Sequence, residues 1–354
     1  MAYEEKFREL SVDQNKFNNL DFDIKAIRIS IRYIVRIFGV KLAIYILKTI
    51  NFLLFSSFYE RINYIKYLLH INILRLESIV SLAKNDLTEF FEIKSLMCDI
   101  SINQFFSENL KKSAGVYKNT IFRDDNNSKK EALKIKVVGS KKKEKFYIYG
   151  PNVLSDPNSK YKDFTIIFLK NYPGNISSFN KSFLFMNNFY YINVISKNET
   201  LRKEVINKYS KCFVSNNNLD LLDGFHNINY IFPQSFLGSL MGLGRILYFL
   251  RSSYENIECV IEGFDFYLEK NPYENLKYPK IERLKDNSFN AAERQFCLSL
   301  LEHDFMYNFV IIKEILKDIN IIDSDKFKEI ISLDENEYAK KLLRQRNFSS
   351  LLFF

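Results

Sequence analysis

The spacing of apolar residues divides this chain into two parts. Before position 124 apolar residues recur at three- and four-residue steps, as at 62–82 and 87–100, which is typical of amphipathic helices. Beyond position 134, short runs of β-branched and aromatic residues alternate with helical stretches. The runs are 135–138, 146–149, 164–168, 183–186, 190–195 and 260–261. This alternation predicts an α/β fold with a mostly parallel sheet flanked by helices, preceded by an all-helical N-terminal region.

A polar, turn-rich segment at 124–134 separates the two parts and is expected to be a linker. The chain, with 354 residues, is long enough for one large domain or two ordinary ones. We therefore expect a helical region at 1–123, an α/β domain at 135–330 and a helical tail at 331–354.

The most apolar stretch, 24–58, also carries a row of cations. Lys41 and Lys48 interrupt it, whereas a membrane-spanning helix needs about 20 largely uncharged residues, so we do not expect a span. Two interpretations stay open and are compatible: the helix packs on its neighbours with a solvated basic face, or it docks on an anionic membrane surface. The cations at helical spacing ahead of these lysines are Lys25, Arg28, Arg32 and Arg36.

Composition narrows the class of protein. Hydrophobic residues make up 47% of the chain, enough for a sizeable core, and the net charge of +9 favours anionic partners. The charge is spread out and no nucleic-acid-binding module is recognisable, so we do not expect a nucleic-acid partner. The cysteines form no CxxC pair and are expected to be reduced core residues, which points to a cytoplasmic location. They are Cys98, Cys212, Cys259 and Cys297.

Polar and small residues follow several predicted strands. Ligands of open parallel sheets bind beyond the carboxyl ends of the strands, so these positions are candidate binding residues, although each is also an ordinary turn residue. A helix at 240–250 is preceded by small residues that can bind an anion at its N-terminus. The positions are Gly150, Pro151, Asn152, Asn171, Asn187 or Asn188, Gly238 and Ser239, with Ser235 as an alternative to the last two.

The segment Gly263-Phe264-Asp265-Phe266-Tyr267 follows the predicted strand at 260–261. The hydroxyls of Tyr267 and Tyr273 could donate hydrogen bonds to a leaving phosphate and so stabilise negative charge without a metal. His303 could remove a proton from an acceptor hydroxyl, because an imidazole titrates near neutral pH. Each residue alone is more often a packing residue than a catalytic one, so the order and the spacing carry the hypothesis.

Read in order, these positions resemble family 42 of the glycosyltransferases, the bacterial sialyltransferases. In that family an early strand ends in a Gly-Pro turn, an Asn lies twenty residues beyond the Pro, and a second Asn follows the next strand. Pro151, Asn171 and Asn187 match this pattern.

The family's catalytic end matches as well. A Gly-Ile-Asp-Phe-Tyr segment precedes a second tyrosine by six residues, as Tyr267 precedes Tyr273. The family's catalytic histidine lies five residues before a polar residue that opens a helix, as His303 precedes Asn308. The resemblance covers about residues 135–325.

The resemblance implies a Rossmann-like domain that transfers sialic acid from CMP-N-acetylneuraminate to a glycan or glycolipid acceptor of a bacterial surface polysaccharide or lipooligosaccharide. It implies inversion at the anomeric carbon, no metal and no cofactor besides the CMP-sugar donor. His303 would be the general base, and Tyr267 and Tyr273 would bind the departing phosphate. The donor would be held by Gly150, Pro151, Asn152, Asn171, Asn187, Gly238, Ser239 and Asp265.

Departures from the family pattern leave the donor sugar open. Tyr149 replaces the family's Asn before the Gly-Pro turn, and no Arg precedes the small residues at 235–239. CMP-Kdo or another CMP-nonulosonate is therefore an alternative donor. A non-enzymatic membrane-docking scaffold with a degenerate Rossmann-like domain is a second alternative. A metal-dependent transferase using Asp124-Asp125 or Asp220 and Asp223 is a third. We expect a peripheral protein at the inner face of the bacterial cytoplasmic membrane, and the oligomeric state stays open, a homo-oligomer included.

Overall fold

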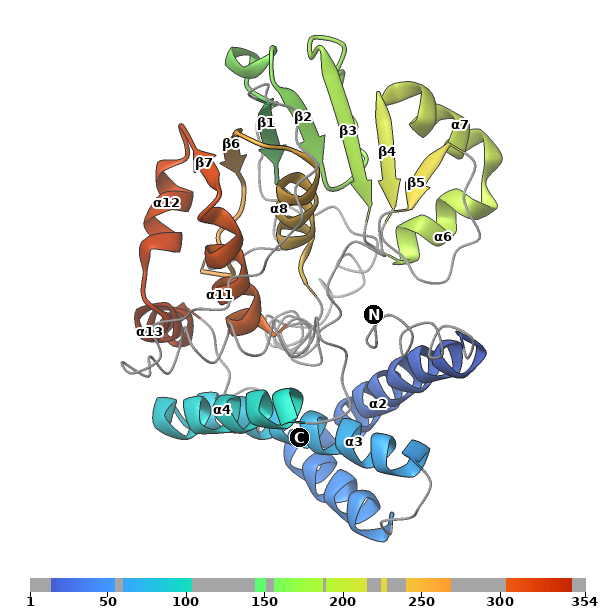
Figure 1. Ribbon diagram of the computed structural model, residues 1–354, viewed down its shortest axis with the longest axis vertical. Helices are drawn as coiled ribbons and strands as arrows, with labels where there is room; N and C mark the ends of the chain where they lie inside the picture. The colour runs from blue at the N-terminus through green and yellow to red at the C-terminus, as the bar shows by residue number, and fades with distance from the viewer. Residues whose placement is uncertain are drawn as a thin grey trace, which may run out of the picture.

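The computed structural model describes residues 14–54, 60–103, 144–150, 156–186, 189–214, 224–227, 240–268 and 304–345 (Figure 1). The helices are α2 (Gln14–Leu53), α3 (Glu60–Ala83), α4 (Leu87–Asn103), α6 (Phe189–Lys197), α7 (Glu199–Lys208), α8 (Gly242–Ser253), α11 (Phe305–Leu316), α12 (Asp325–Ser332) and α13 (Glu335–Gln345), with a short 3-10 helix at Ser159–Tyr161. The strands are β1 (Glu144–Tyr149), β2 (Thr165–Phe168), β3 (Lys181–Met186), β4 (Lys211–Val214), β5 (Phe225–Asn227), β6 (Ile257–Glu262) and β7 (Ile319–Ile321).

The strands form one sheet in the order β5-β4-β3-β2-β1-β6-β7, and all the described pairs are parallel. The chain runs from β1 out to β5 at one edge and then crosses back to add β6 on the other side of β1. The predicted α/β fold, a Rossmann-like parallel sheet flanked by helices after an all-helical region, is confirmed.

One predicted strand is wrong. Residues 190–195 form the middle of helix α6, with Ile192 and Ile195 buried on one face and Val194 exposed. The aromatic and β-branched run favours a strand locally, but parallel neighbours β3 and β4 need a crossover connection, and α6 with α7 provides it. The predicted strand at 135–138 and the linker at 124–134 lie outside the described residues, and strands β4, β5 and β7 were not predicted.

Alternate residues of β1 face two different cores. Phe146 and Ile148 belong to the larger core, which includes buried residues of α8 and α11. Tyr147 and Tyr149 belong to the smaller core, which includes buried residues of α6 and α7. The sheet is therefore a middle layer between two sets of helices, as expected for parallel strands buried on both faces (Figure 1).

Helices α2 to α4 form a layer beside the sheet domain and share its larger core. Leu47 of α2, Ile79 of α3 and Phe90 of α4 lie in the same buried cluster as Ile311 of α11. Helix α2 is kinked at Gly39, whose φ of 74° and ψ of 172° are not helical. None of the described helices has an apolar stretch long and uncharged enough to cross a membrane.

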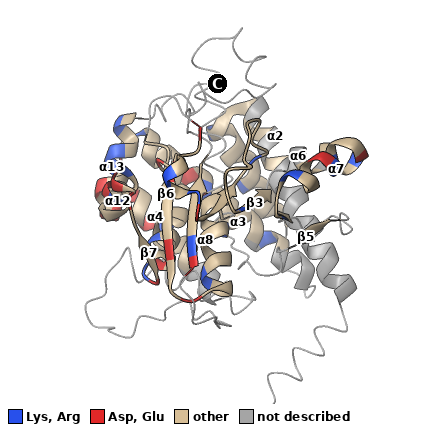
Figure 2. Cartoon of the chain, turned by 90° about the horizontal axis from the view of Figure 1, so that it is seen from above, with Lys and Arg blue, Asp and Glu red and all other residues tan. Residues whose placement is uncertain are grey.

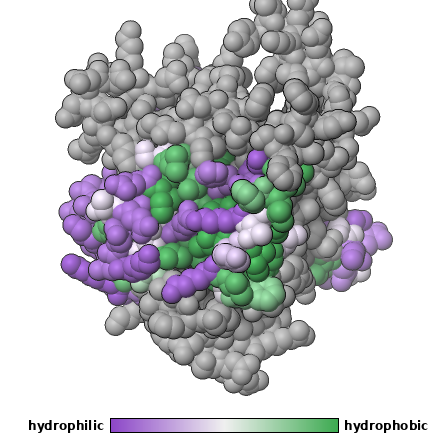
Figure 3. Space-filling view, turned by 90° about the horizontal axis from the view of Figure 1, so that it is seen from below, coloured by the Kyte–Doolittle hydropathy of each residue, from purple (hydrophilic) through white to green (hydrophobic). Residues whose placement is uncertain are grey.

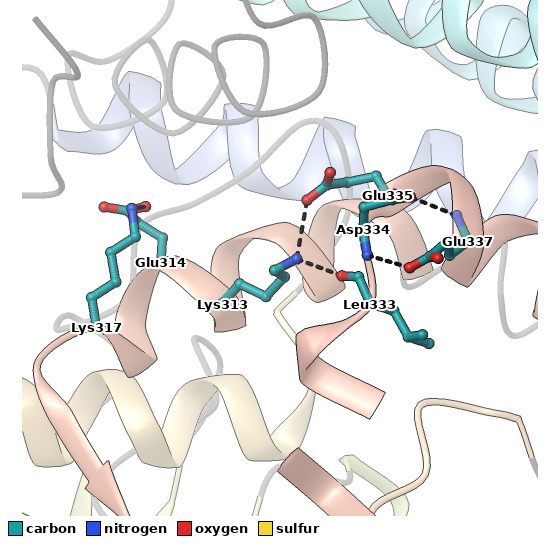
Figure 4. A network of polar contacts seen from close by, with 7 residues as sticks. All are labelled: Lys313, Glu314, Lys317, Leu333, Asp334, Glu335 and Glu337. Atoms are coloured by element: carbon teal, nitrogen blue, oxygen red, sulfur yellow. Dashed lines mark hydrogen bonds and ion pairs between the residues drawn. The ribbon is translucent and has the colours of Figure 1, made fainter. Parts of the chain in front are cut away.

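Helices α12 and α13 continue this core. The Lys313 ammonium of α11 donates to the Leu333 carbonyl at 2.6 Å and pairs with Glu335 at 3.4 Å (Figure 4). This holds α13 on α11, where the ring of Tyr338 stacks on Phe309 at 4.0 Å. The predicted helical tail is helical through its described part, but its proposed boundary at 330 falls inside α12.

Three cysteines lie in the core, as predicted. Cys98, Cys212 and Cys259 are buried, and burial raises the pKa of the Cys212 thiol to about 12 and also raises that of Cys259. Cys297 lies outside the described residues. These thiols pack as small apolar groups rather than acting as nucleophiles.

Candidate functional site

The strand order places a topological switch point between β1 and β6. From β1 the chain adds strands in one direction, and β6 begins the other direction. In open parallel sheets, ligands bind at such a point beyond the carboxyl ends of the strands. The residues that follow β1 and β6 are therefore the first place to look for a site.

The turns after β1 and β6 touch each other through Gly150. Its amide donates to the Glu262 carbonyl at 2.8 Å. A Cβ at position 150 would lie 2.5 Å from the Gly263 carbonyl oxygen and 2.7 Å from the ring of Phe264. Only glycine fits, because the contacts are with backbone that cannot turn away. The predicted binding residue Gly150 thus lies directly against the predicted catalytic loop.

The loop after β6 has an unusual backbone. Gly263, Phe266 and Tyr267 have φ values of 75°, 49° and 66°. Left-handed φ is uncommon for a residue with a side chain, and two aromatic residues in succession require support from their surroundings. Asp265, which is buried, supplies part of it by accepting from the Tyr267 amide at 3.0 Å, and its carbonyl accepts from the Leu268 amide at 3.0 Å.

Packing supplies the rest of that support. The ring of Phe266 lies edge-on to Phe309 of α11 at 5.5 Å and also contacts Phe327 of α12. The Tyr338 hydroxyl of α13 donates to the Phe266 carbonyl at 2.9 Å. Three helices from the end of the described chain therefore hold this loop in its left-handed conformation. Strained backbone that is held in this way is concentrated at functional sites.

The loop reaches the start of two helices. The Tyr267 hydroxyl donates to the thioether sulfur of Met241, the residue before α8, at 2.7 Å. The Met241 amide in turn donates to the side-chain oxygen of Asn308 at 2.7 Å. Tyr267 is a predicted site residue, Asn308 is the residue predicted to open the helix after His303, and Met241 links the two.

The start of α11 differs from the prediction. Asn308 does not open the helix, which begins at Phe305 with Asp304 as its N-cap; the Asp304 carboxylate accepts from the Tyr307 amide at 2.9 Å. Asn308 lies in the first turn, fully buried, and donates to the Asp304 carbonyl at 3.0 Å. The helix starts after Asp304 because the Asp304 carboxylate accepts a hydrogen bond from a free amide of the first turn. Its negative charge also interacts favourably with the positive end of the helix dipole.

Asp304 also joins the helical layer to the sheet domain. Its carboxylate pairs with the Lys94 ammonium of α4, and the two side chains are 1% and 3% exposed. Beside the pair, the rings of Phe90 and Phe305 stack at 6.1 Å, so that α4 lies against the N-terminal end of α11 (Figure 1). Asp304 follows His303 in the chain, so a residue of the helical layer holds the segment next to the predicted base.

Tyrosines and carboxylates gather on the other face of the sheet at the same edge. The Tyr147 hydroxyl donates to the Glu262 carboxylate, and burial, followed by this bond, raises the pKa of Tyr147. Burial, with Glu262 as a second cause, raises the pKa of Tyr149 to about 12. The Tyr172 hydroxyl donates to Asp156, and its pKa is also about 12. These hydroxyls stay protonated at neutral pH and act as hydrogen-bonding groups rather than as bases.

Asn171 lies one strand away, beyond the end of β2. Its side-chain oxygen accepts from the Tyr209 hydroxyl at 3.0 Å, and that hydroxyl accepts from the Tyr172 amide at 2.8 Å. Asn171 is thus oriented through its oxygen. The neighbouring Lys170 is partly buried, and this burial lowers its pKa to about 8.

Several predicted residues lie outside the described residues, so their placement stays a prediction. The structure brings together Gly150, Asp265 and Tyr267, with Asn308 beside them through Met241. The positions outside are Pro151, Asn152, Asn187, Ser235, Gly238, Ser239, Tyr273 and His303, together with the aspartates at 124, 125, 220 and 223.

Three residues of this region were not predicted from the sequence. Lys94 had a signal, because it takes the position between Phe90 and Met97 on the apolar stripe of its helix, where a buried charge needs a partner. Glu262 directly follows the apolar run Cys259-Val260-Ile261 at the end of β6, which also marks it. Met241 had none.

The described residues contain no group of three or more side chains arranged to hold a metal ion. Comparison of the chain with protein-family models, with curated proteins and with solved structures finds no match. The function must therefore be argued from the residues and their geometry.

Proposed function

We propose that this chain is an inverting, metal-independent glycosyltransferase that takes its sugar from a CMP-activated donor. The donor most in keeping with the sequence is CMP-N-acetylneuraminate, and the acceptor is a hydroxyl of a bacterial surface glycan. CMP-Kdo or another CMP-nonulosonate is the alternative donor, because the same leaving group and the same base would serve.

One observation carries the proposal. The segment that resembles the catalytic loop of bacterial sialyltransferases lies at the switch point of a parallel sheet, with left-handed φ at Phe266 and Tyr267. Gly150 touches this loop from the end of β1. Two segments far apart in the sequence, each carrying part of the resemblance, thus meet where this class of fold binds nucleotides.

The chemistry assigns one task to each residue. His303 takes the proton of an acceptor hydroxyl, whose oxygen attacks the anomeric carbon from the face opposite the nucleotide. The bond from that carbon to the phosphate oxygen breaks, and CMP departs with the bonding electrons. When the donor is bound, the hydroxyl of Tyr267 turns from the sulfur of Met241 to the phosphate. Hydrogen bonds from Tyr267 and Tyr273 then stabilise the charge that develops on the phosphate, the role that a metal has in other transferases.

The helical layer has a positioning role in this proposal. Lys94 fixes the carboxylate of Asp304, which in turn caps α11. The residue before Asp304 is His303, so movement of the α11 start would move the base relative to the phosphate. We place the protein in the cytoplasm, peripheral at the inner face of the membrane, where CMP-sugars and lipid-linked acceptors meet.

The test follows CMP release from CMP-N-acetylneuraminate and from CMP-Kdo. We expect slow hydrolysis of one of the two compounds, which identifies the donor, and faster release of CMP when a suitable acceptor is added. His303→Ala is expected to abolish transfer while CMP still raises the melting temperature. The matched control is His70→Ala, because His70 is exposed in the helical layer. Full transfer by His303→Ala would overturn the role of that residue.

The two tyrosines give a graded test. Tyr267→Phe and Tyr273→Phe each remove one hydroxyl contact, worth about 1–3 kcal/mol of transition-state stabilisation, or roughly 5- to 150-fold in kcat. The scaffold alternative predicts instead that no cytidine nucleotide changes the melting temperature and that neither donor is consumed.

A further inference from the structure

Beyond its kink at Gly39, helix α2 exposes a row of apolar side chains. Tyr45, Phe52 and Leu53 are 69%, 79% and 60% exposed. Leu42, Tyr45 and Phe52 are three and seven residues apart and so share one face of the helix, with Leu53 next to Phe52 and the polar Thr49 between Tyr45 and Phe52. We call Leu42, Tyr45, Phe52 and Leu53 the α2 stripe.

The α2 stripe is not needed for the core. The opposite face of the same helix segment is already buried, through Val40, Ala43 and Leu47. A surface helix ordinarily carries mainly polar residues on the face turned away from its neighbours, whereas here large apolar side chains also lie on that face, beside lysines. Contiguous exposed apolar residues of this kind mark an interaction surface. Figure 3 shows apolar side chains gathered on the underside of the molecule next to hydrophilic ones.

The positive charge around the α2 stripe indicates which kind of partner binds there. Between positions 24 and 59 the sequence has six basic residues and no acidic one. Lys41 and Lys48 are exposed and lie one turn before and one turn after Tyr45, with Lys48 also paired to Glu77 of α3 at 2.6 Å. Elsewhere both signs are mixed, as on α7, α12 and α13 (Figure 2).

We propose that the α2 stripe lies in the interface of an anionic lipid bilayer, with Lys41 and Lys48 at the level of the headgroups. Aromatic and leucine side chains beside lysines are the composition of helices that lie in the membrane plane. The inference specifies the surface for the peripheral location proposed above, and it does not depend on the reaction.

The experiment is co-sedimentation of the full chain with vesicles of phosphatidylcholine containing phosphatidylglycerol, and with vesicles of phosphatidylcholine alone. We expect binding to the anionic vesicles that weakens with salt. The variant Phe52→Ser/Leu53→Ser should lose about tenfold or more in affinity, because two exposed apolar side chains no longer insert. Both positions are exposed, so the fold is kept. The matched control, Leu96→Ser/Val194→Ser, removes two exposed apolar residues from α4 and α6 and should bind as the wild type does.

Three results would overturn the inference. The first is the absence of binding to anionic vesicles. The second is equal affinity of the Phe52→Ser/Leu53→Ser variant and the wild type. The third is a wild-type oligomer that this variant converts to monomers without any vesicle binding, because a second copy of the chain then covers the α2 stripe. Vesicle binding by a chain that releases no CMP would refute the reaction and leave the membrane surface standing.

Discussion

The two regions that meet around the start of α11 are built in different ways. The seam between the helical layer and the sheet domain consists of Phe90, Lys94, Asp304 and Phe305, and it is made of buried side chains in paired contact. The second region, which we call the edge, is the carboxyl ends of β1 and β6. It depends instead on close backbone approach at Gly150 and on left-handed φ at Gly263, Phe266 and Tyr267. The seam stabilises the molecule, whereas the left-handed backbone at the edge lowers its stability and holds one fixed loop conformation.

Two lysines show how differently the two regions place a cation. Lys94 at the seam is buried and faces the carboxylate of Asp304. Lys170 lies near the edge, beyond β2, where it is partly buried, and this burial lowers its pKa to about 8. The seam therefore balances a fully buried charge with an opposite charge, whereas partial burial near the edge makes the charged form of Lys170 less favourable.

The largest expected effect is at the seam. Lys94→Met leaves the Asp304 carboxylate buried without its cation and should lower the free energy of unfolding by about 3–5 kcal/mol. Lys94→Met/Asp304→Asn should recover most of this loss, because asparagine also caps a helix. Urea unfolding measures both. Lys203→Met, which breaks an exposed pair with Glu199, should cost about 0–1 kcal/mol. Equal small losses in Lys94→Met and Lys203→Met would show that the seam does not depend on the ion pair.

Lys170 should make stability depend on pH. Its pKa is about 8 in the folded chain against 10.5 for a free lysine. Between these values the unfolded chain binds more protons, so the stability of the wild type should rise with pH relative to Lys170→Met. The change is about 3 kcal/mol from pH 8 to pH 10.5. Below pH 8 the lysine is charged in both states and the difference is constant. Unfolding at a series of pH values measures this, with Lys203→Met as the exposed control, and a flat difference would contradict the burial of Lys170.

Of the three changes, Gly150→Ala should have the smallest effect on stability, but it should also remove the response to CMP. Gly150→Ala forces the ends of β1 and β6 apart and should cost about 1–3 kcal/mol. It should also abolish the rise in melting temperature caused by CMP, because the loop of Tyr267 moves. Gly174→Ala is a control of the same size, because the atoms nearest to its Cβ belong to the side chain of Tyr172 and not to the backbone at the ends of β1 and β6. If Gly150→Ala still responds to CMP as the wild type does, the edge is not the nucleotide site.

The sequence predicted most of the elements that surround the site. The apolar runs at 146–149, 164–168, 183–186 and 260–261 are strands because β-branched and aromatic residues favour a buried extended backbone. The run at 190–195 has the same composition, yet it is a helix, because parallel β3 and β4 need a long crossover connection and this run forms part of it. The short strands β4, β5 and β7 give too few apolar positions to be recognised without their neighbours.

By itself the sequence determined the class of fold, the loop from Gly263 to Tyr267 and the excess of positive charge on α2, because propensity, periodicity and composition are local properties. Only the tertiary structure decided that Gly150 touches that loop and that Tyr267 meets Met241. The tertiary structure alone also shows that Lys94 pairs with Asp304, which is 210 positions away along the chain. Such contacts follow from how the sheet and the helical layer pack, and no local pattern in the chain specifies which distant residue will complete them.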